Sequence, residues 1–176
     1  MPKYLKFILI FLLSLIFFLL QRVFVDSWSG FWGRINIPLL LVISIFIFNS
    51  FKSSFYFALF LGIILDLFSF YPFGLYSASL LLTLLLADFV WSNFFTNRSI
   101  YSFLVLGVFL TIFYNVFSYF IFFLFENNLS NLAWFNRFFW LNLLYELVWV
   151  FIIITALFYL LGRQKGRFSG LSFEKN

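Results

Sequence analysis

The chain has 176 residues, of which 65% are hydrophobic and 10% are charged, and its formal net charge is +5. An ordinary soluble domain is about 45–50% apolar and about 25% charged, and a small water-soluble fold cannot remove this much apolar surface from solvent. The chain contains no cysteine and no histidine, which excludes disulfides, thiol nucleophiles and Cys/His metal sites.

Six apolar stretches predict helices that cross a lipid bilayer, because about 20 helical residues span a hydrocarbon core of ~30 Å. The first stretch resembles a signal peptide but is followed by no small-residue cleavage site, so we expect it to remain as an uncleaved helix. The third is the shortest, and it could form with the fourth a hairpin that does not cross, which would lower the count from six to four. In chain order the stretches are 4–25, 35–51, 55–69, 74–91, 100–125 and 134–161.

The distribution of basic residues predicts the orientation, since cytoplasmic loops are enriched in Lys and Arg. With six crossings both termini share a side, and that side holds eight of the eleven basic residues: Lys3, Lys6, Lys52, Arg98, Arg163, Lys165, Arg167 and Lys175. We therefore expect a transmembrane helical domain over 1–161 and a basic cytoplasmic tail over 162–176. Anionic lipid headgroups, rather than nucleic acid, are the expected partner of this charge.

Asp66 lies inside an apolar stretch, where a charge at mid-depth costs at least ~2.5 kcal/mol on insertion scales. Gly62, Asp66 and Ser69 share one helix face, and the glycine lets another backbone approach closely. Pro72 and Gly74 predict a tight turn into the next helix. Two interpretations remain open: a polar clamp that holds the hairpin or a partner helix, or a solvated carboxylate near the outer interface.

Asp88 lies late in the fourth stretch, behind a stripe of small and hydroxyl-bearing side chains. Residues of this kind at helical spacing favour a helix–helix contact, and the alternative is the lining of a small-molecule cavity. Asp88 itself could cap the cytoplasmic end of the helix. The stripe consists of Tyr76, Ser79, Thr83 and Ala87.

Glu146 is near the middle of the last stretch, and Asn142 is one turn earlier on the same face. Because we expect no Lys or Arg at matching depth, Glu146 should be protonated or bonded to polar groups of another helix. A packing role is favoured, and proton or ligand handling is the alternative. The candidate partners in the fifth stretch are Asn115, Ser118 and Thr111.

The sequence motifs of catalysis are absent: there is no phosphate-binding glycine loop, no G-x-S-x-G and no H-E-x-x-H. An aspartyl mechanism needs two adjacent carboxylates, whereas Asp66 and Asp88 are expected near opposite membrane faces. We therefore expect a protein that is not an enzyme and uses no cofactor or metal.

The segment from Gly62 through Asp66, Pro72 and Gly74 into the following apolar helix resembles the rod shape-determining protein MreD family, which carries a similar G-x-x-x-D followed by P-x-G. The close resemblance covers residues 62–91, and the chain's size and helix number also match. It implies a non-catalytic scaffold subunit of the cell-elongation machinery in the cell inner membrane, linking peptidoglycan synthesis to the cytoskeleton. The implied partners are an MreC-like protein, actin-like MreB and peptidoglycan-synthesis proteins.

That family is also similar in fold to the substrate-binding S components of energy-coupling-factor vitamin transporters, which gives an alternative function. An S component implies a closed polar cavity near the outer face, fed by the loops 26–34 and 126–137, whereas a scaffold implies no deep ligand pocket. S components dock through Ala-rich helix faces, but this chain has five alanines and no A-x-x-x-A. An unrelated small polytopic protein, including a lipid-handling enzyme, is a third possibility.

Overall fold

A computed structural model describes residues 3–25, 27, 33, 35–69, 71–94, 100–125 and 139–164. Within these residues the protein is all-helical and has no strand. The elements are α1 (Lys3–Leu19), its π-helical continuation η1 (Leu20–Val25), α2 (Ile37–Phe48), α3 (Phe51–Leu67), α4 (Leu75–Phe94), α5 (Ile100–Phe125) and α7 (Trp140–Gln164).

Three of these helices are long and apolar enough to cross a membrane. The apolar spans are Leu75–Phe94, Tyr101–Leu124 and Trp140–Tyr159, with mean hydropathies of 1.6, 2.0 and 2.1. The 12 residues of α2 extend about 18 Å, which is less than the ~30 Å of a hydrocarbon core. The lengths and compositions are those of an α-helical membrane bundle.

Several helix ends differ from the expected ones. The helix of the second stretch ends at Phe48, and α3 begins at Phe51, earlier than expected. Ser50 caps α3, because its Oγ accepts the backbone N–H of Ser53 at 3.4 Å. The last helix continues to Gln164, so the first three residues of the expected tail are helical. The rest of that tail and the loop 126–137 lie outside the described residues.

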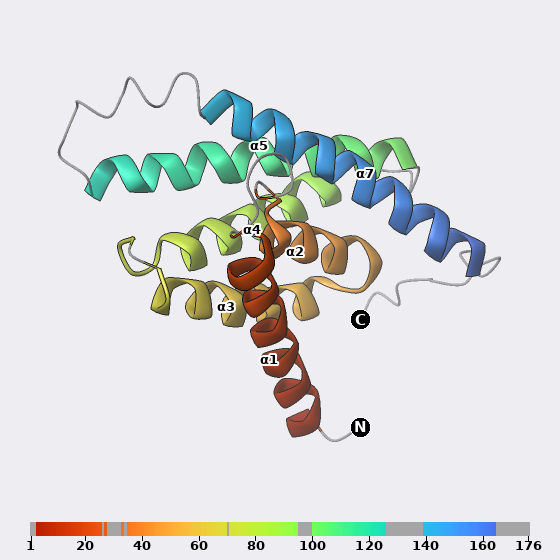
Figure 1. Ribbon diagram of the computed structural model, residues 1–176. Helices are drawn as coiled ribbons and strands as arrows, with labels where there is room; N and C mark the ends of the chain where they lie inside the picture. The colour runs from red at the N-terminus through yellow and green to blue at the C-terminus, as the bar shows by residue number, and fades with distance from the viewer. Residues whose placement is uncertain are drawn as a thin grey trace.

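The helices pack as two antiparallel pairs that share a contact (Figure 1). One pair is α3 with α4 and the other is α5 with α7, and α4 joins them by packing on α5. The short α2 lies against α3, and α1 crosses α3 at a steep angle. Each pair therefore presents its outer face away from the bundle centre.

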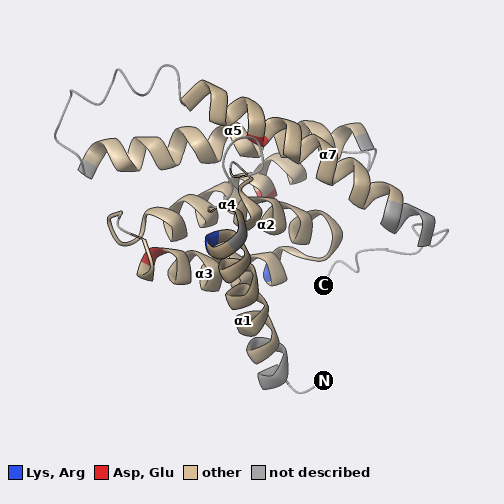
Figure 2. Ribbon diagram, in the orientation of Figure 1, with Lys and Arg blue, Asp and Glu red and all other residues tan. Residues whose placement is uncertain are grey.

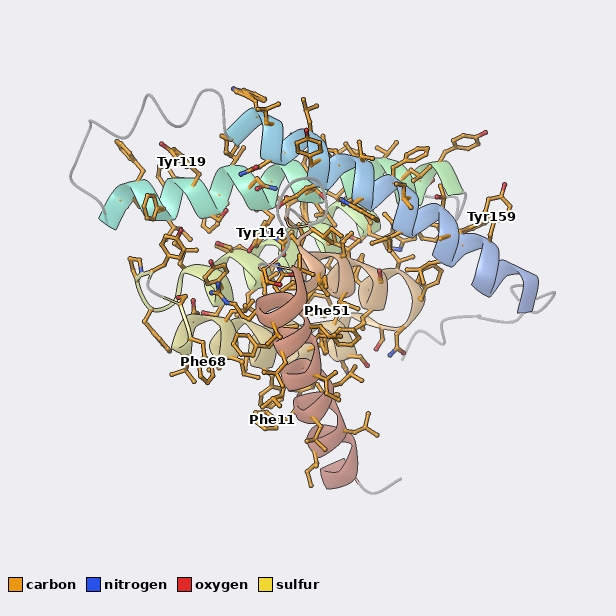
Figure 3. All side chains as sticks on the ribbon, in the orientation of Figure 1. Phe11, Phe51, Phe68, Tyr114, Tyr119 and Tyr159 are labelled. Atoms are coloured by element: carbon orange, nitrogen blue, oxygen red, sulfur yellow. The ribbon has the colours of Figure 1, made fainter. Side chains whose placement is uncertain are left out.

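Apolar side chains fill the core and also cover much of the surface. The fully buried core residues come from α2, α3, α4, α5 and α7 and include Leu39, Phe57, Leu61, Leu80, Leu84, Leu106, Leu110 and Ile154. About half of the Ile8, Leu12 and Ile16 surface on α1 is exposed, and Tyr159 points away from the bundle (Figure 3). Charged side chains are sparse on the described helices (Figure 2). Such an apolar exterior is stable in lipid.

Candidate functional site

Gly62 lies where α3 and α4 approach most closely. It is buried, and a Cβ at this position would stand 2.6 Å from the Cα of Ser77. A contact this short with backbone requires one of the helices to shift, so the observed spacing needs a residue without a side chain. The close backbone approach expected from the sequence is therefore present between α3 and α4.

The Asp66 side chain joins α3 to the first turn of α4. Only 3% of its surface is exposed. Its Oδ1 accepts the backbone N–H of Tyr76 at 2.8 Å, and its Oδ2 accepts that of Ser77 at 3.1 Å. The first N–H groups of a helix have no partner within it, and a negative charge at this end is favourable to the helix dipole. Asp66 is thus a clamp within the hairpin rather than a solvated carboxylate.

The turn between the two helices depends on Pro72 and Gly74. Gly74 has a φ of +99°, in the left-handed region that favours glycine. The Pro72 carbonyl accepts the N–H of Leu75 at 3.3 Å, and the Gly74 carbonyl accepts that of Ala78 at 2.9 Å. The four positions of the MreD-like motif therefore build one local structure, in which the turn delivers the first amides of α4 to Asp66.

The stripe on α4 packs against other helices. Ser79, Thr83 and Ala87 are buried, and the two hydroxyls donate to carbonyls of their own helix: Ser79 to Leu75 at 2.6 Å and Thr83 to Ser79 at 2.7 Å. Both hydroxyl groups therefore have their hydrogen-bond acceptors within α4, so this face of the helix can pack against its neighbours. Asp88 is exposed and lies off this buried face.

Glu146 contacts the fifth helix through one of the expected partners. The Nδ2 of Asn115 donates to the Oε2 of Glu146 and also to the carbonyl of Thr111 at 3.0 Å. The hydroxyls of Thr111 and Ser118 instead donate to backbone carbonyls of α5. Asn115 therefore links the half-buried Glu146 carboxylate on α7 to α5.

A polar cavity of about 250 Å³ lies beside this link. It is partly open and lies between η1, α2 with the residues just before it, α3, the start of α4, α5 and α7. Its lining residues are Gln21, Arg22, Gly33, Ile35, Asn36, Pro38, Leu65, Tyr76, Tyr114, Asn142 and Glu146. The S-component alternative implies a closed polar cavity and a scaffold implies no deep pocket, whereas this cavity is polar but partly open.

Arg22 lines the same cavity as Glu146, so a basic residue of another helix shares this space with the carboxylate. Glu146 lies toward the end of α7 that faces η1 and the start of α2, since residues of all three elements line the cavity. This is the end of the bundle where η1 finishes and α2 begins. Asn142 also lines the cavity, and its exposed side chain places it at the rim.

Two amide side chains in the cavity wall are held by the first turn of α2. The Oε1 of Gln21 accepts the N–H of Ile37 at 3.0 Å, and the Oδ1 of Asn36 accepts that of Leu39 at 3.3 Å. Asn36 lines the cavity together with Tyr114 and Glu146. Because its oxygen caps α2, its NH₂ group is the donor toward the cavity.

Five residues that line the cavity were not predicted from the sequence to share one site: Gln21, Arg22, Asn36, Tyr76 and Tyr114. Figure 3 places Tyr114 near the centre of the bundle, on α5. The sequence does have polar residues at the end of the first apolar stretch and the start of the second, and Tyr114 next to Asn115. Such residues are common at helix ends and helix contacts, so they did not indicate a shared cavity.

No family model, curated protein or solved structure matches the chain. Among the described residues, no group of three or more acidic side chains could hold a metal ion. Two features of this molecule bear on its function: the clamped α3–α4 hairpin and the polar cavity.

Proposed function

We propose that the chain is a non-catalytic scaffold subunit of the bacterial cell-elongation machinery, with a role similar to that of MreD. The supporting observation is the α3–α4 hairpin, in which Gly62, Asp66, Pro72 and Gly74 act together. These are the positions that carry the resemblance. A hairpin clamped by a buried carboxylate holds its outer faces at a fixed angle, which suits a surface on which other membrane proteins assemble.

The proposal includes the location and partners that the resemblance implies. The chain would cross the inner membrane six times with both termini in the cytoplasm. Its partners would be an MreC-like protein in the membrane, MreB on the cytoplasmic side, and peptidoglycan-synthesis proteins. The apolar outer faces of α1, α5 and α7 supply the surface available to lipid or to such partners.

Depletion in a rod-shaped host tests the scaffold role. We expect depleted cells to become round, and an MreC-like protein to co-purify with the tagged chain from mild detergent. Complementation by Asp66→Ala should fail at membrane levels matched to wild type, whereas Asp88→Asn should restore rod shape. Depleted cells that keep their width and length would contradict the proposal.

A second candidate function is favoured by the cavity. Arg22 and Glu146, which carry side chains of opposite charge type, line the same partly open cavity, and polar side chains that converge on one cavity are typical of ligand sites. This observation supports a solute-binding subunit similar to the S components of vitamin transporters. Saturable binding of one radiolabelled vitamin from a panel would support this function, and absence of binding across the panel would leave the scaffold as the better proposal.

A further inference from the structure

The cavity has the size of a very small solute. At about 30 Å³ for each water molecule, its volume of about 250 Å³ corresponds to roughly eight waters. An amino acid or a compound of similar size fits this volume, whereas drug-sized ligands occupy pockets of about 300–1,000 Å³. The cavity therefore limits the ligand to a compact molecule or to one compact group of a larger molecule.

The cavity wall carries both signs of charge. Arg22 on η1 and Glu146 on α7 both line it, and they come from opposite ends of the chain. A guanidinium presents a fork of N–H donors that matches a carboxylate or phosphate, and a carboxylate accepts hydrogen bonds from an ammonium group. A ligand with one group of each sign can form charged contacts with both residues, whereas a singly charged ligand can form such a contact with only one of them.

Glu146 is held in place before any ligand arrives. It receives a hydrogen bond from Asn115 on α5, and the same Asn115 amide also donates to the carbonyl of Thr111. A carboxylate held by a neighbouring helix reorganises less when it binds, and such preorganisation increases affinity.

We infer that this cavity binds a molecule that carries a primary ammonium group close to an anionic group. Glu146 would accept the ammonium, Arg22 would bind the anion, and Tyr76 and Asn142 would contact the atoms between them. This inference depends on the cavity alone and is independent of the proposed scaffold role. Two sources supply this chemistry: a free amino acid, and the phosphoethanolamine headgroup of a lipid.

Binding to the full chain in nanodiscs distinguishes the two sources. In nanodiscs of phosphatidylglycerol and phosphatidylcholine, which lack primary amines, the twenty amino acids and glycerophosphoethanolamine are titrated by calorimetry. In parallel, native mass spectrometry measures phosphatidylethanolamine retained from mixed nanodiscs. Amino-acid binding indicates the free solute, and retained lipid displaced by glycerophosphoethanolamine indicates the headgroup.

Ligand analogues test the residue assignments. Removing the ammonium, as in the hydroxy acid matching the best amino acid, should weaken binding roughly ten- to a hundredfold. Glu146→Gln should weaken amino-acid binding to a similar extent and abolish the preference for amino acid over hydroxy acid. Arg22→Gln should instead abolish the preference for amino acid over its amide. For the headgroup, ethanolamine and phosphoglycerol serve as the two half-ligands.

Matched controls lie outside the cavity. Asp88→Asn changes an exposed carboxylate to an amide, and Lys52→Gln removes an exposed cation; both should bind as wild type does. Absence of binding by every probe and of retained lipid would overturn the inference. Binding that is unchanged in both Glu146→Gln and Arg22→Gln would also overturn it, because the ligand would then occupy another place.

Discussion

The Oδ1 of Asp66, on α3, accepts the backbone N–H of Tyr76, on α4, at 2.8 Å. Tyr76 in turn lines the polar cavity, as does Leu65, the residue before Asp66. The hairpin clamp and the cavity are therefore adjacent, and the contact that fixes the start of α4 also positions one wall of the cavity.

Replacing Asp66 should destabilise the hairpin. In Asp66→Ala, two first-turn N–H groups of α4 lose a charged acceptor while they remain buried, which should cost about 2–4 kcal/mol. Asp66→Asn keeps one acceptor oxygen and should lose less. Unfolding in mixed micelles with increasing SDS measures the difference, and the exposed Asp88→Asn serves as the control. Equal stability of Asp66→Ala and Asp88→Asn would show that the clamp contributes nothing.

Adding a methyl group at the two buried glycines should have different effects. In Gly62→Ala the new Cβ meets the Ser77 backbone at 2.6 Å, which no rotamer change can relieve, so we expect a cost of about 1–3 kcal/mol. In Gly107→Ala the nearest atom is the Cδ1 end of the Ile154 side chain, and Ile154→Val should rescue it. Unfolding in mixed micelles measures both effects. The distinction would be contradicted if a smaller neighbouring side chain failed to rescue Gly107→Ala, or if it rescued Gly62→Ala as well.

The hairpin could be predicted from the sequence because its parts are local. Gly62, Asp66 and the Pro72–Gly74 turn lie within thirteen residues, and helix periodicity places the first two on one face. The sequence left open whether Asp66 is a clamp or a solvated carboxylate. Only the structure decides this, because the groups that donate to Asp66 are backbone amides. Backbone groups leave no signal in side-chain spacing.

The cavity could not be predicted in this way, because its walls come from distant parts of the chain. Arg22 lies near the start of the chain and Glu146 in the last helix, and the apolar stretch 134–161 predicted Glu146 near mid-membrane. Asn36 lies just before a helix and looks like an ordinary N-cap, which it also is. A single sequence contains no evidence that the N-cap Asn36 and the carboxylate of Glu146 line the same cavity.

The hydrogen bond between Asn115 and Glu146 should couple α5 to α7. We expect a double-mutant cycle of Asn115→Ala and Glu146→Gln to give a coupling free energy of about 0.5–2 kcal/mol. Asn115→Ala combined with Thr155→Val is the control, since the Thr155 hydroxyl donates to carbonyls of its own helix and the two effects should add. An additive cycle for Asn115 and Glu146 would mean that this contact does not hold the helices together.

Cysteine labelling can determine whether α3 crosses the membrane, because the chain has no native cysteine. The 17 residues of α3 extend about 26 Å, close to a hydrocarbon thickness of ~30 Å. Asn49 and Phe73 are exposed at its two ends, so Asn49→Cys and Phe73→Cys should fold normally. If the chain crosses six times, a membrane-impermeant maleimide added to intact cells should label Phe73→Cys, and Asn49→Cys should react only after the membrane is opened. Labelling of both from one side would show a hairpin that re-enters without crossing, and the chain would then have four crossings.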